Sequence, residues 1–477
     1  MRTLSFKRPG GGAANSSLIR SDWAAGLGFP LVFVMVSFLL TPVGAADFSL
    51  HTLFGFGANP NDPKNPQGGL VQGSYGNFYG TTAFGGTGGD NGSVFSITPN
   101  GTVTNLLFFN STNGSHPTGN LVLGTDGLFY GTTAFGGASN DNGTVFKITS
   151  NGVFTSLFSF NGANGSRPMA GLFQGSDSLF YGTTAFGGAS NDNGTVFKIT
   201  SNGVYTRLLS FNGTNGSRPM AGLVQGIDGS YYGTTASGGS TVTNGTVFKI
   251  TSTGVFTLLS SFSGTNGSDP EGTLVQAPDG NFYGTTLTGG TTDSGTVFRI
   301  TPGGALTRLY SFTGGLDGNS PAAGLTLGSD TNFYGTTEGT TTTNLGTVFR
   351  ISTNGALTTL ATFDGTNGAS PVAKLVQGRI DGNFYGTGFD HGPAGGGTVF
   401  RLVPSPTVTK VAVTNGFAKV TWVSFTNGVF RAEFKAAMTD PAWTPLVPDI
   451  VATSNQTSLT NGFGSGTQRF YHIRLLP

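Results

Sequence analysis

Two positions of an internal repeat carry side chains that could bind a ligand. The first position precedes a recurring proline and differs from copy to copy: Asn65, His116, Arg167, Arg218, Asp269, Ser320 and Ser370. The second position is aromatic in three consecutive copies only: Phe84, Phe135, Phe186, then Ser237, Thr288, Gly339 and Asp390. Aromatic rings stack on the apolar faces of sugars, and Arg donates hydrogen bonds to hydroxyl or carboxylate oxygens.

These residue types predict a carbohydrate-binding patch. Its candidate ligand-binding residues are Phe84, Phe135, Phe186, His116, Arg167, Arg218 and Asp269. Identical turns would not need such varied side chains, which is why we single these positions out. An alternative stays open, in which each Phe packs beneath its own loop and the Arg side chains are merely solvated.

Residues suited to catalysis are sparse. A glycoside hydrolase needs two carboxylates across a cleft, but Glu271 and Glu338 are the only glutamates in the repeats, and Asp269, Glu271 and Asp390 are expected to lie well apart. The recurring aspartates are expected in tight turns on the opposite face, with a structural role: Asp126, Asp177, Asp228, Asp279, Asp330 and Asp381. We assign no catalytic residue and keep a hydrolase or lyase as an alternative.

Metal binding is not indicated either. Two Asn-Asp-Asn-Gly runs, at 140–143 and 191–194, offer side-chain oxygens. No acidic residue follows them at the spacing of an EF-hand, so turns built by Asn and Asp are favoured over a calcium site. Cysteine is absent, which excludes disulfides and Cys-ligated metals. We therefore expect no metal and no cofactor.

The elements that position these side chains recur with a fixed spacing. Tyr-Gly-Thr begins at Tyr79 and again 51 residues later at Tyr130 (130 − 79 = 51), and so on through Tyr385. In the third copy, short strands are expected at 153–160, 172–174, 179–184 and 195–200. Four antiparallel strands in each of seven copies predict an all-β, seven-bladed β-propeller, with a β-solenoid as the main alternative.

The repeat also predicts how the ring closes. An unpaired strand at 50–56 precedes the first copy, and the last copy stops after 397–403, one strand short. The N-terminal strand should therefore complete the seventh blade and pair both open edges. In a propeller the two long loops of each copy open on one face, which makes that face the expected binding surface.

Residues near the expected axis are small or polar. Glycines in Tyr-Gly-Thr-Thr and after each inner strand, such as Gly124, are expected to let backbones approach closely. A recurring glutamine on the inner strand is expected to line a solvated axial channel: Gln72, Gln174, Gln225, Gln276 and Gln377.

Three regions follow from the changes in composition. Basic residues before an apolar stretch at 31–40 and small residues at 43–45 predict a signal peptide over 1–45, with an uncleaved anchor as the alternative. The propeller is expected at 47–403. Residues 404–477 predict a small β-sandwich-like module with Trp422 and Trp443 in its core. That module could equally be a sorting element or a cap without a partner.

The charge balance limits the partners. Only 9% of the 477 residues are charged and the formal net charge is +1, so nucleic acid is not an expected partner. A membrane is expected as a partner only if the N-terminal segment stays uncleaved. A glycan or another cell-surface component is the expected partner class.

The repeat unit resembles the GloVer tandem-repeat family of exported bacterial proteins with varied C-terminal anchors. The resemblance rests on the segments 279–286 and 295–300 and their counterparts in all seven copies. It implies export and surface display, and no catalytic residues come with it. The unit is also distantly similar to NHL-type propeller repeats, some of which are lyases that use His and a metal. His51, His116, His391 and His472 occupy unrelated repeat positions, so that activity is not supported. We therefore expect an exported, non-catalytic recognition protein, with a structural envelope protein as the second possibility.

Overall fold

The computed structural model describes residues 48–475, except 88, 139–140, 190–191, 240–243, 340–343, 405–407, 415–416, 424–428, 437–438, 441, 454–455 and 463–469. The expected signal peptide, residues 1–45, lies outside the described residues. The chain forms two compact units, one from Leu50 to Val403 without Ile380–Gly382 and one that contains the chain after Val403. Within the described part of the chain, no helix is long and apolar enough to cross a membrane.

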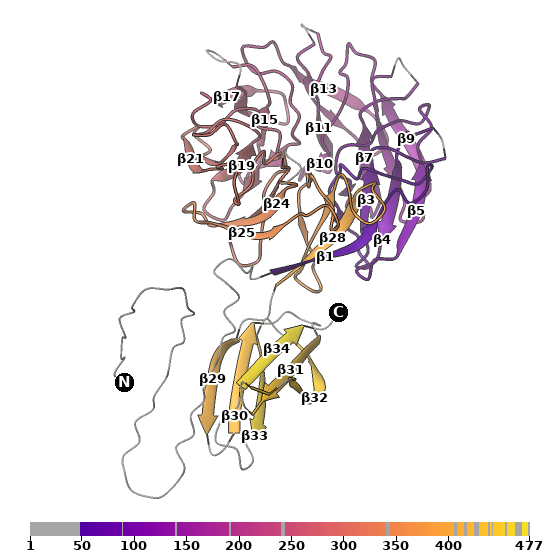
Figure 1. Cartoon of the computed structure of the whole chain (residues 1–477). Coiled ribbons are helices and arrows are strands. Elements are labelled where there is room, and N and C mark those ends of the chain that lie inside the picture. Colours follow the sequence, from indigo (N-terminus) through magenta and orange to yellow (C-terminus); the bar gives the residue numbers. More distant parts are fainter. Residues whose placement is uncertain are drawn as a thin grey trace, which may run out of the picture. The chain divides into compact units, whose positions relative to one another are not determined.

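The first unit is a seven-bladed β-propeller, as predicted, and not a solenoid (Figure 1). Each blade is a four-stranded antiparallel sheet, and in blades 1 to 6 the strands are consecutive in the sequence. Blades 1 and 2 contain β2 (Val71–Gln72), β3 (Phe78–Thr82), β4 (Ser93–Ile97), β5 (Val103–Phe108), β6 (Val122–Leu123), β7 (Phe129–Thr133), β8 (Thr144–Ile148) and β9 (Phe154–Ser159).

The next four blades repeat this arrangement. Blades 3 and 4 contain β10 (Phe173–Gln174), β11 (Phe180–Thr184), β12 (Thr195–Ile199), β13 (Tyr205–Ser210), β14 (Val224–Gln225), β15 (Tyr231–Thr235), β16 (Thr246–Ile250) and β17 (Phe256–Ser261). Blades 5 and 6 contain β18 (Val275–Gln276), β19 (Phe282–Thr286), β20 (Thr296–Ile300), β21 (Leu306–Ser311), β22 (Thr326–Leu327), β23 (Phe333–Thr337), β24 (Thr347–Ile351) and β25 (Leu357–Thr362).

The seventh blade confirms the predicted closure. Its strand order is β1-β28-β27-β26, which places the first described strand at the outer edge of the last blade. These strands are β1 (Phe48–Gly55), β26 (Val376–Gln377), β27 (Phe384–Gly388) and β28 (Thr398–Pro404). The N–H of Phe56 donates to the carbonyl of Gly397, and the N–H of Gly396 donates to the carbonyl of Phe56, each at 2.9 Å. Closure thus pairs both edges without a disulfide.

Aromatic stacking joins each blade to the next and explains the recurring Tyr. At every interface, the Tyr of Tyr-Gly-Thr packs on the aromatic residue that begins the same strand of the next blade, with ring centroids 3.8–4.3 Å apart. The seven pairs are Tyr79–Phe129, Tyr130–Phe180, Tyr181–Tyr231, Tyr232–Phe282, Tyr283–Phe333, Tyr334–Phe384 and Tyr385–Phe78. These rings are buried, so they supply much of the apolar contact between blades.

The recurring Asp and Gln have structural roles on the tight-turn face. In blades 2 to 6 the Tyr hydroxyl donates to the Asp of its own turn, as in Tyr181 to Asp177 at 2.6 Å. The structure corrects the expectation that the glutamines are simply solvated. Each glutamine's carboxamide oxygen accepts from a turn N–H of the preceding blade, as when Gln225 accepts from Ser176 at 3.0 Å. Gln72 closes this series by accepting from the N–H of Arg379 at 2.8 Å.

The glycines near the axis are of two kinds. A Cβ on Gly131 would lie 2.6 Å from the ring of Phe146, and one on Gly124 would lie 2.6 Å from the Asp126 carboxylate. Side chains therefore occupy the space beside these glycines, whereas the sequence predicted that neighbouring backbones would occupy it. Backbones do approach closely just before the inner strands. A Cβ on Gly119 would lie 2.5 Å from the carbonyl carbon of Ala170 in the next blade.

The second unit contains two three-stranded sheets, ordered β29-β30-β33 and β32-β31-β34, as a sandwich-like module requires. Its strands are β29 (Val408–Thr414), β30 (Phe417–Val423), β31 (Val429–Lys435), β32 (Thr444–Val451), β33 (Gln456–Gly462) and β34 (Phe470–Leu475). Trp422 is fully buried with Phe430 and Ile473, as predicted for Trp422. The prediction for Trp443 is wrong: it is only half-buried, with the Lys435 amine 5.1 Å from its ring centre.

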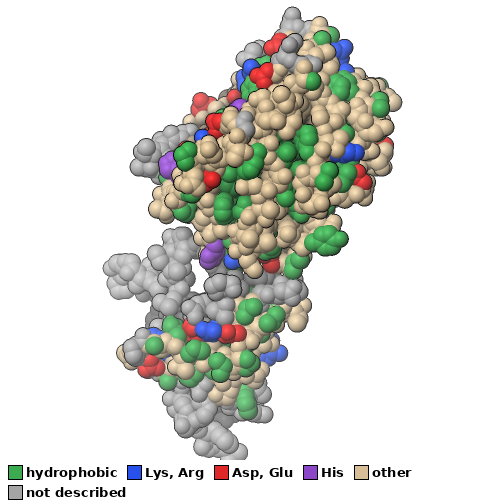
Figure 2. All heavy atoms as spheres, turned by 90° about the vertical axis from the view of Figure 1, so that its right-hand side faces the viewer, with side chains coloured by type: hydrophobic (Ala, Val, Ile, Leu, Met, Phe, Trp, Pro, Cys, Tyr) green, Lys and Arg blue, Asp and Glu red, His purple; other side chains and the backbone are tan. Residues whose placement is uncertain are grey.

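The low charge of the sequence is visible on the surface. On the face drawn in Figure 2, the charged side chains of the propeller lie scattered among polar, apolar and backbone atoms. A binding site on this unit therefore depends on a few particular side chains and not on a broad charged field.

Candidate binding site on the long-loop face

The position before the recurring proline has an unusual backbone in all seven blades. Its φ lies between 49° and 62° at Asn65, His116, Arg167, Arg218, Asp269, Ser320 and Ser370. This left-handed region is uncommon for residues other than Gly and costs about 1–3 kcal/mol. Backbone hydrogen bonds hold it: the N–H of Arg167 donates to Asn142, and the carbonyl of Arg167 accepts from Ala185. Because the backbone is the same in every copy, the variation among side chains serves something other than the turn.

The two long loops of each blade meet at the second candidate position. Ser115 pairs with Phe135 and Ser166 pairs with Phe186 in short antiparallel bridges between these loops. The bridges confirm that both loops open on one face of the propeller. Phe84, Phe135 and Phe186 are half-buried, so part of each side chain remains accessible.

Six of the seven predicted residues form one continuous arc, which we call the aromatic-basic arc: Phe84, His116, Phe135, Arg167, Phe186 and Arg218. The His116 ring is 4.7 Å from that of Phe84 and 5.4 Å from that of Phe135. The Arg167 guanidinium lies 4.9 Å from Phe135 and 5.2 Å from Phe186, and Arg218 lies 5.9 Å from Phe186. His116 and Arg167 thus each bridge rings of two neighbouring blades, and Arg218 extends the arc beyond Phe186.

The basic groups of the arc differ in charge. Arg167 and Arg218 are exposed, and their guanidinium groups are charged at any physiological pH. Burial lowers the pKa of His116, although Asp90 and Asp141 act in the opposite direction. His116 is therefore a neutral imidazole at neutral pH, with Nδ1 hydrogen-bonded to the Ser115 hydroxyl.

The seventh predicted residue, Asp269, lies outside the arc. It is half-buried, and its Oδ1 atom is buried with no hydrogen-bond partner among the described residues. Burial raises its pKa, while Arg218 lowers it. Its charge acts on Glu271, two residues further along the chain.

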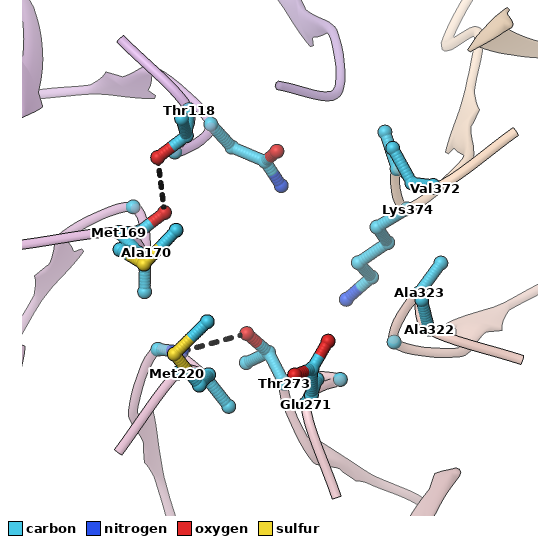
Figure 3. Close-up of a pocket in the computed structure, with 18 of the residues that line it drawn as sticks. Thr118, Met169, Ala170, Met220, Glu271, Thr273, Ala322, Ala323, Val372 and Lys374 are labelled. Carbon is cyan, nitrogen blue, oxygen red and sulfur yellow. Dashed lines mark hydrogen bonds between the residues drawn. The ribbon is translucent and has the colours of Figure 1, made fainter. Parts of the chain in front are cut away.

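The segments that follow the recurring prolines surround a pocket of about 280 Å³ (Figure 3). Every blade contributes the residue directly after its proline: Gln67, Thr118, Met169, Met220, Glu271, Ala322 and Val372. Neighbouring segments are tied together, since the Thr118 hydroxyl donates to the Met169 carbonyl at 3.0 Å and the Gly222 N–H donates to the Thr273 hydroxyl at 3.1 Å. The three basic residues of the arc, His116, Arg167 and Arg218, each precede a pocket residue by two positions, as Arg167 precedes Met169, so this side of the arc lies near the pocket.

Three charged residues line this axial pocket, and each is the only charged residue at its position in the seven copies. Glu271 stands where other copies have Gln67, Thr118, Met169, Met220, Ala322 and Val372. Glu338 stands where they have Ala83, Ala134, Ala185, Ala236, Leu287 and Phe389. Lys374 stands where they have Gly69, Asn120, Gly171, Gly222, Thr273 and Gly324. Aligning the copies would have identified all three, but none of them was among the predicted binding residues.

Lys374 and Glu271 point into the pocket and toward one another (Figure 3). The structure gives neither side chain an ion pair or hydrogen bond with any residue it describes. Burial lowers the pKa of the Lys374 amine. Burial, together with the charges of Asp269 and Glu338, raises the pKa of Glu271 to about 7, against the opposing effect of Arg218. Burial also raises the pKa of Glu338.

Glu271 and Glu338, the two glutamates of the repeats, line the same pocket. The described residues contain no group of three His, Asp or Glu side chains placed to hold an ion. In the segment 140–143, which was expected to form a turn built by Asn and Asp, Asp141 accepts from the N–H of Gly136 at 2.5 Å.

Fold and site define a seven-bladed β-propeller with an axial pocket beside an aromatic-basic arc. The chain belongs to the Gloeobacter/Verrucomicrobia repeat family, whose model matches residues 36–240 and 220–427. The match confirms the resemblance seen in the repeat unit. No curated protein sequence matches the chain.

Solved structures with a similar fold have varied functions. The extracellular domain of a putative hybrid two-component system from B. thetaiotaomicron is 12% identical, with a TM-score of 0.46 over 89% of this chain and 57% of that one, so this chain spans little more than half its length. A gluconolactonase from Xanthomonas campestris is 13% identical, with a TM-score of 0.42 over 79% and 95%. The polysaccharide lyase Uly1 is 9% identical, with a TM-score of 0.44 over 74% and 91%. Similarities this distant say nothing of what this chain binds.

Proposed function

We propose that this chain is an exported, non-catalytic recognition protein that binds carbohydrate through the aromatic-basic arc. The observation that carries the proposal is the alternation of three Phe rings with His116, Arg167 and Arg218 across neighbouring blades. The proposed partner is a glycan or another component of a cell surface.

The chemistry of the arc supports a sugar chain over a small apolar ligand. Exposed ring faces suit the C–H faces of pyranose rings, and guanidinium groups between them donate to hydroxyl or carboxylate oxygens. The arc extends over consecutive blades, so successive sugars of one chain could meet equivalent ring and guanidinium groups. The left-handed backbone at each basic position holds these side chains on rigid loops, which lowers the entropy lost on binding.

Export is part of the proposal and has its own support. The basic residues, the apolar stretch and the small residues before position 46 are those of a signal peptide. The second unit is proposed as an accessory module, either for attachment or as a cap.

A glycan and polysaccharide array of the purified protein tests this function. The repeat itself supplies conservative variants: Phe135→Ser introduces the residue of blade 4, and Arg167→Ser introduces the residue of blades 6 and 7. Both are expected to reduce binding at least about tenfold. Arg308→Ser is the matched control, because Arg308 lies on β21 and donates to the Thr265 carbonyl. If no glycan binds, or if binding is unchanged in both arc variants, the proposal is wrong and a structural envelope role gains support.

A second candidate function, a propeller hydrolase, is favoured by one observation. Glu271 and Glu338 line the same pocket, and a pKa of about 7 for Glu271 suits a general acid. Release of new reducing ends from the polysaccharides that bind, lost in Glu271→Gln, would establish catalysis. Binding without release would leave recognition as the function.

A further inference from the structure

The axial pocket contains charges that the propeller does not need for its own stability. At the position of Lys374, four other blades have Gly, while Asn120 and Thr273 accept hydrogen bonds from the N–H groups of Gly69 and Gly222 in the preceding blade. At the position of Glu271, two blades have Met. Five copies therefore contribute to the same hub without a charge at either position. Glu271 and Lys374 are half-buried, and a partly desolvated charge without a partner is unfavourable, so these two residues point to a ligand.

The two groups face each other but leave a gap. Their nitrogen and oxygen atoms do not come within the 4.0 Å of an ion pair. An ammonium group has only donors and a carboxylate has only acceptors. A ligand placed between them must accept from the Lys374 ammonium and, when Glu271 is ionised, donate to its carboxylate. The hydroxyl groups of a sugar do both, because one oxygen accepts from the amine while another O–H donates to the carboxylate.

We infer that the axial pocket holds the terminal sugar of a bound glycan, with hydroxyl groups of that sugar hydrogen-bonded to Lys374 and Glu271. The inference rests on the proposed function and deepens it. The aromatic-basic arc would bind the inner sugars, and the pocket would make the protein specific for a chain end.

The size and position of the pocket support an end over the middle of a chain. Its volume of about 280 Å³ lies at the lower limit for small-molecule pockets, about 300–1,000 Å³. The pocket is surrounded by segments of all seven blades. Met169 and Met220 line it two residues after Arg167 and Arg218, so a chain leaving the pocket would pass directly onto the arc. Flexible Met side chains also adapt to the apolar face of a ring.

Two variants taken from the repeat test the inference. Lys374→Thr introduces the residue of blade 5, and Glu271→Met introduces the residue of blades 3 and 4, so both are expected to fold. The ligands are the three glycans that bind best on the array, each compared with the same glycan carrying a methylated terminal sugar. Free glucose, galactose and mannose serve as competitors. Affinity is measured by calorimetry.

We expect each variant to weaken binding of the unblocked glycans at least about tenfold, as for loss of a hydrogen bond to a charged group. Terminal methylation should weaken binding to the unaltered protein by a similar factor, and one free monosaccharide should compete. Lys147→Thr is the control, because Lys147 lies on β8 and donates to the Ser201 carbonyl outside the pocket.

The failures of the two proposals are distinguishable. Binding that is lost in Arg167→Ser but unchanged in Lys374→Thr and Glu271→Met would overturn the terminal-sugar site and leave the arc as the binding site. Equal binding of blocked and unblocked glycans would overturn it too. If no glycan binds the unaltered protein, the proposed function falls, and the terminal-sugar site falls with it.

Discussion

The rings of Tyr385 and Phe78 lie 4.1 Å apart, although one belongs to the last blade and the other to the first. Their contact has the same form as the six stacks between consecutive blades. The ring therefore closes through the same packing that builds it. Closure also fixes the axis, and the axis is where residues of all seven blades meet.

Loss of this stack should weaken the interface between the last blade and the first blade. We expect Tyr385→Ala to lower the free energy of unfolding by about 3–5 kcal/mol, the range for removing a buried aromatic side chain. Thermal unfolding followed by circular dichroism measures the loss. Tyr75→Ala is the control, because Tyr75 is 94% exposed in a tight turn. Equal unfolding temperatures for the two variants would show that the stack does not hold the ring.

The glutamine of the first blade should contribute less than the stack. Gln72→Leu introduces the residue found at Leu123 and Leu327 and removes the bond from the Arg379 N–H. One hydrogen bond is worth about 1 kcal/mol, and a small fall in the unfolding temperature is expected. Hydrogen exchange should report the same loss locally, as faster exchange of the Arg379 amide. Unchanged exchange there would contradict a role for Gln72 in closure.

Replacement of the axial lysine should stabilise the protein when no ligand is present. Burial disfavours the Lys374 ammonium, as its lowered pKa indicates. In Lys374→Thr the hydroxyl can instead accept from the Gly324 N–H, as Thr273 accepts from Gly222. We expect an unfolding temperature at or above that of the unaltered protein. A marked decrease would mean that Lys374 supports the fold, contrary to its assignment to a ligand.

Stability should fall as pH rises through the range set by Glu271. Its pKa is about 7 in the folded protein, compared with 4.5 for an unperturbed glutamate, so the folded state favours the protonated acid. The stabilisation is complete below about pH 4.5 and is lost as pH rises through 7. Three other charges act on the Glu271 carboxyl, those of Asp269, Glu338 and Arg218, and Lys374 faces it. Solvent in the pocket screens these effects.

After allowance for that screening, we expect a loss of about 1–3 kcal/mol between pH 5 and pH 8. Unfolding temperatures of Glu271→Met over the same range provide the comparison. The difference between the two profiles should follow a single titration near pH 7. Parallel profiles would show that Glu271 does not have a raised pKa.

The blades could be predicted from the sequence because they depend on local features. The alternation in 153–160, the Asp-Gly turns and the 51-residue interval (130 − 79 = 51) act within one copy, and the missing strand after 397–403 indicated the closure. Six of the seven candidate residues proved to be neighbours, because equivalent positions of adjacent blades must come close on one face. In the second unit, Trp443 was wrongly predicted to lie in the core. This unit has no internal repeat, so no equivalent position in another copy could indicate how buried a residue at the end of a turn is.

By itself the sequence determined the strand pattern, the number of blades, the strand that completes the ring and the residues of the arc. Only the tertiary structure decided that Glu271, Glu338 and Lys374 line one pocket. These residues belong to three different blades, and each lies near the axis where the segments before the inner strands converge. These segments converge only when the whole ring closes, so the spacing of residues within a single copy could not predict that they share a pocket.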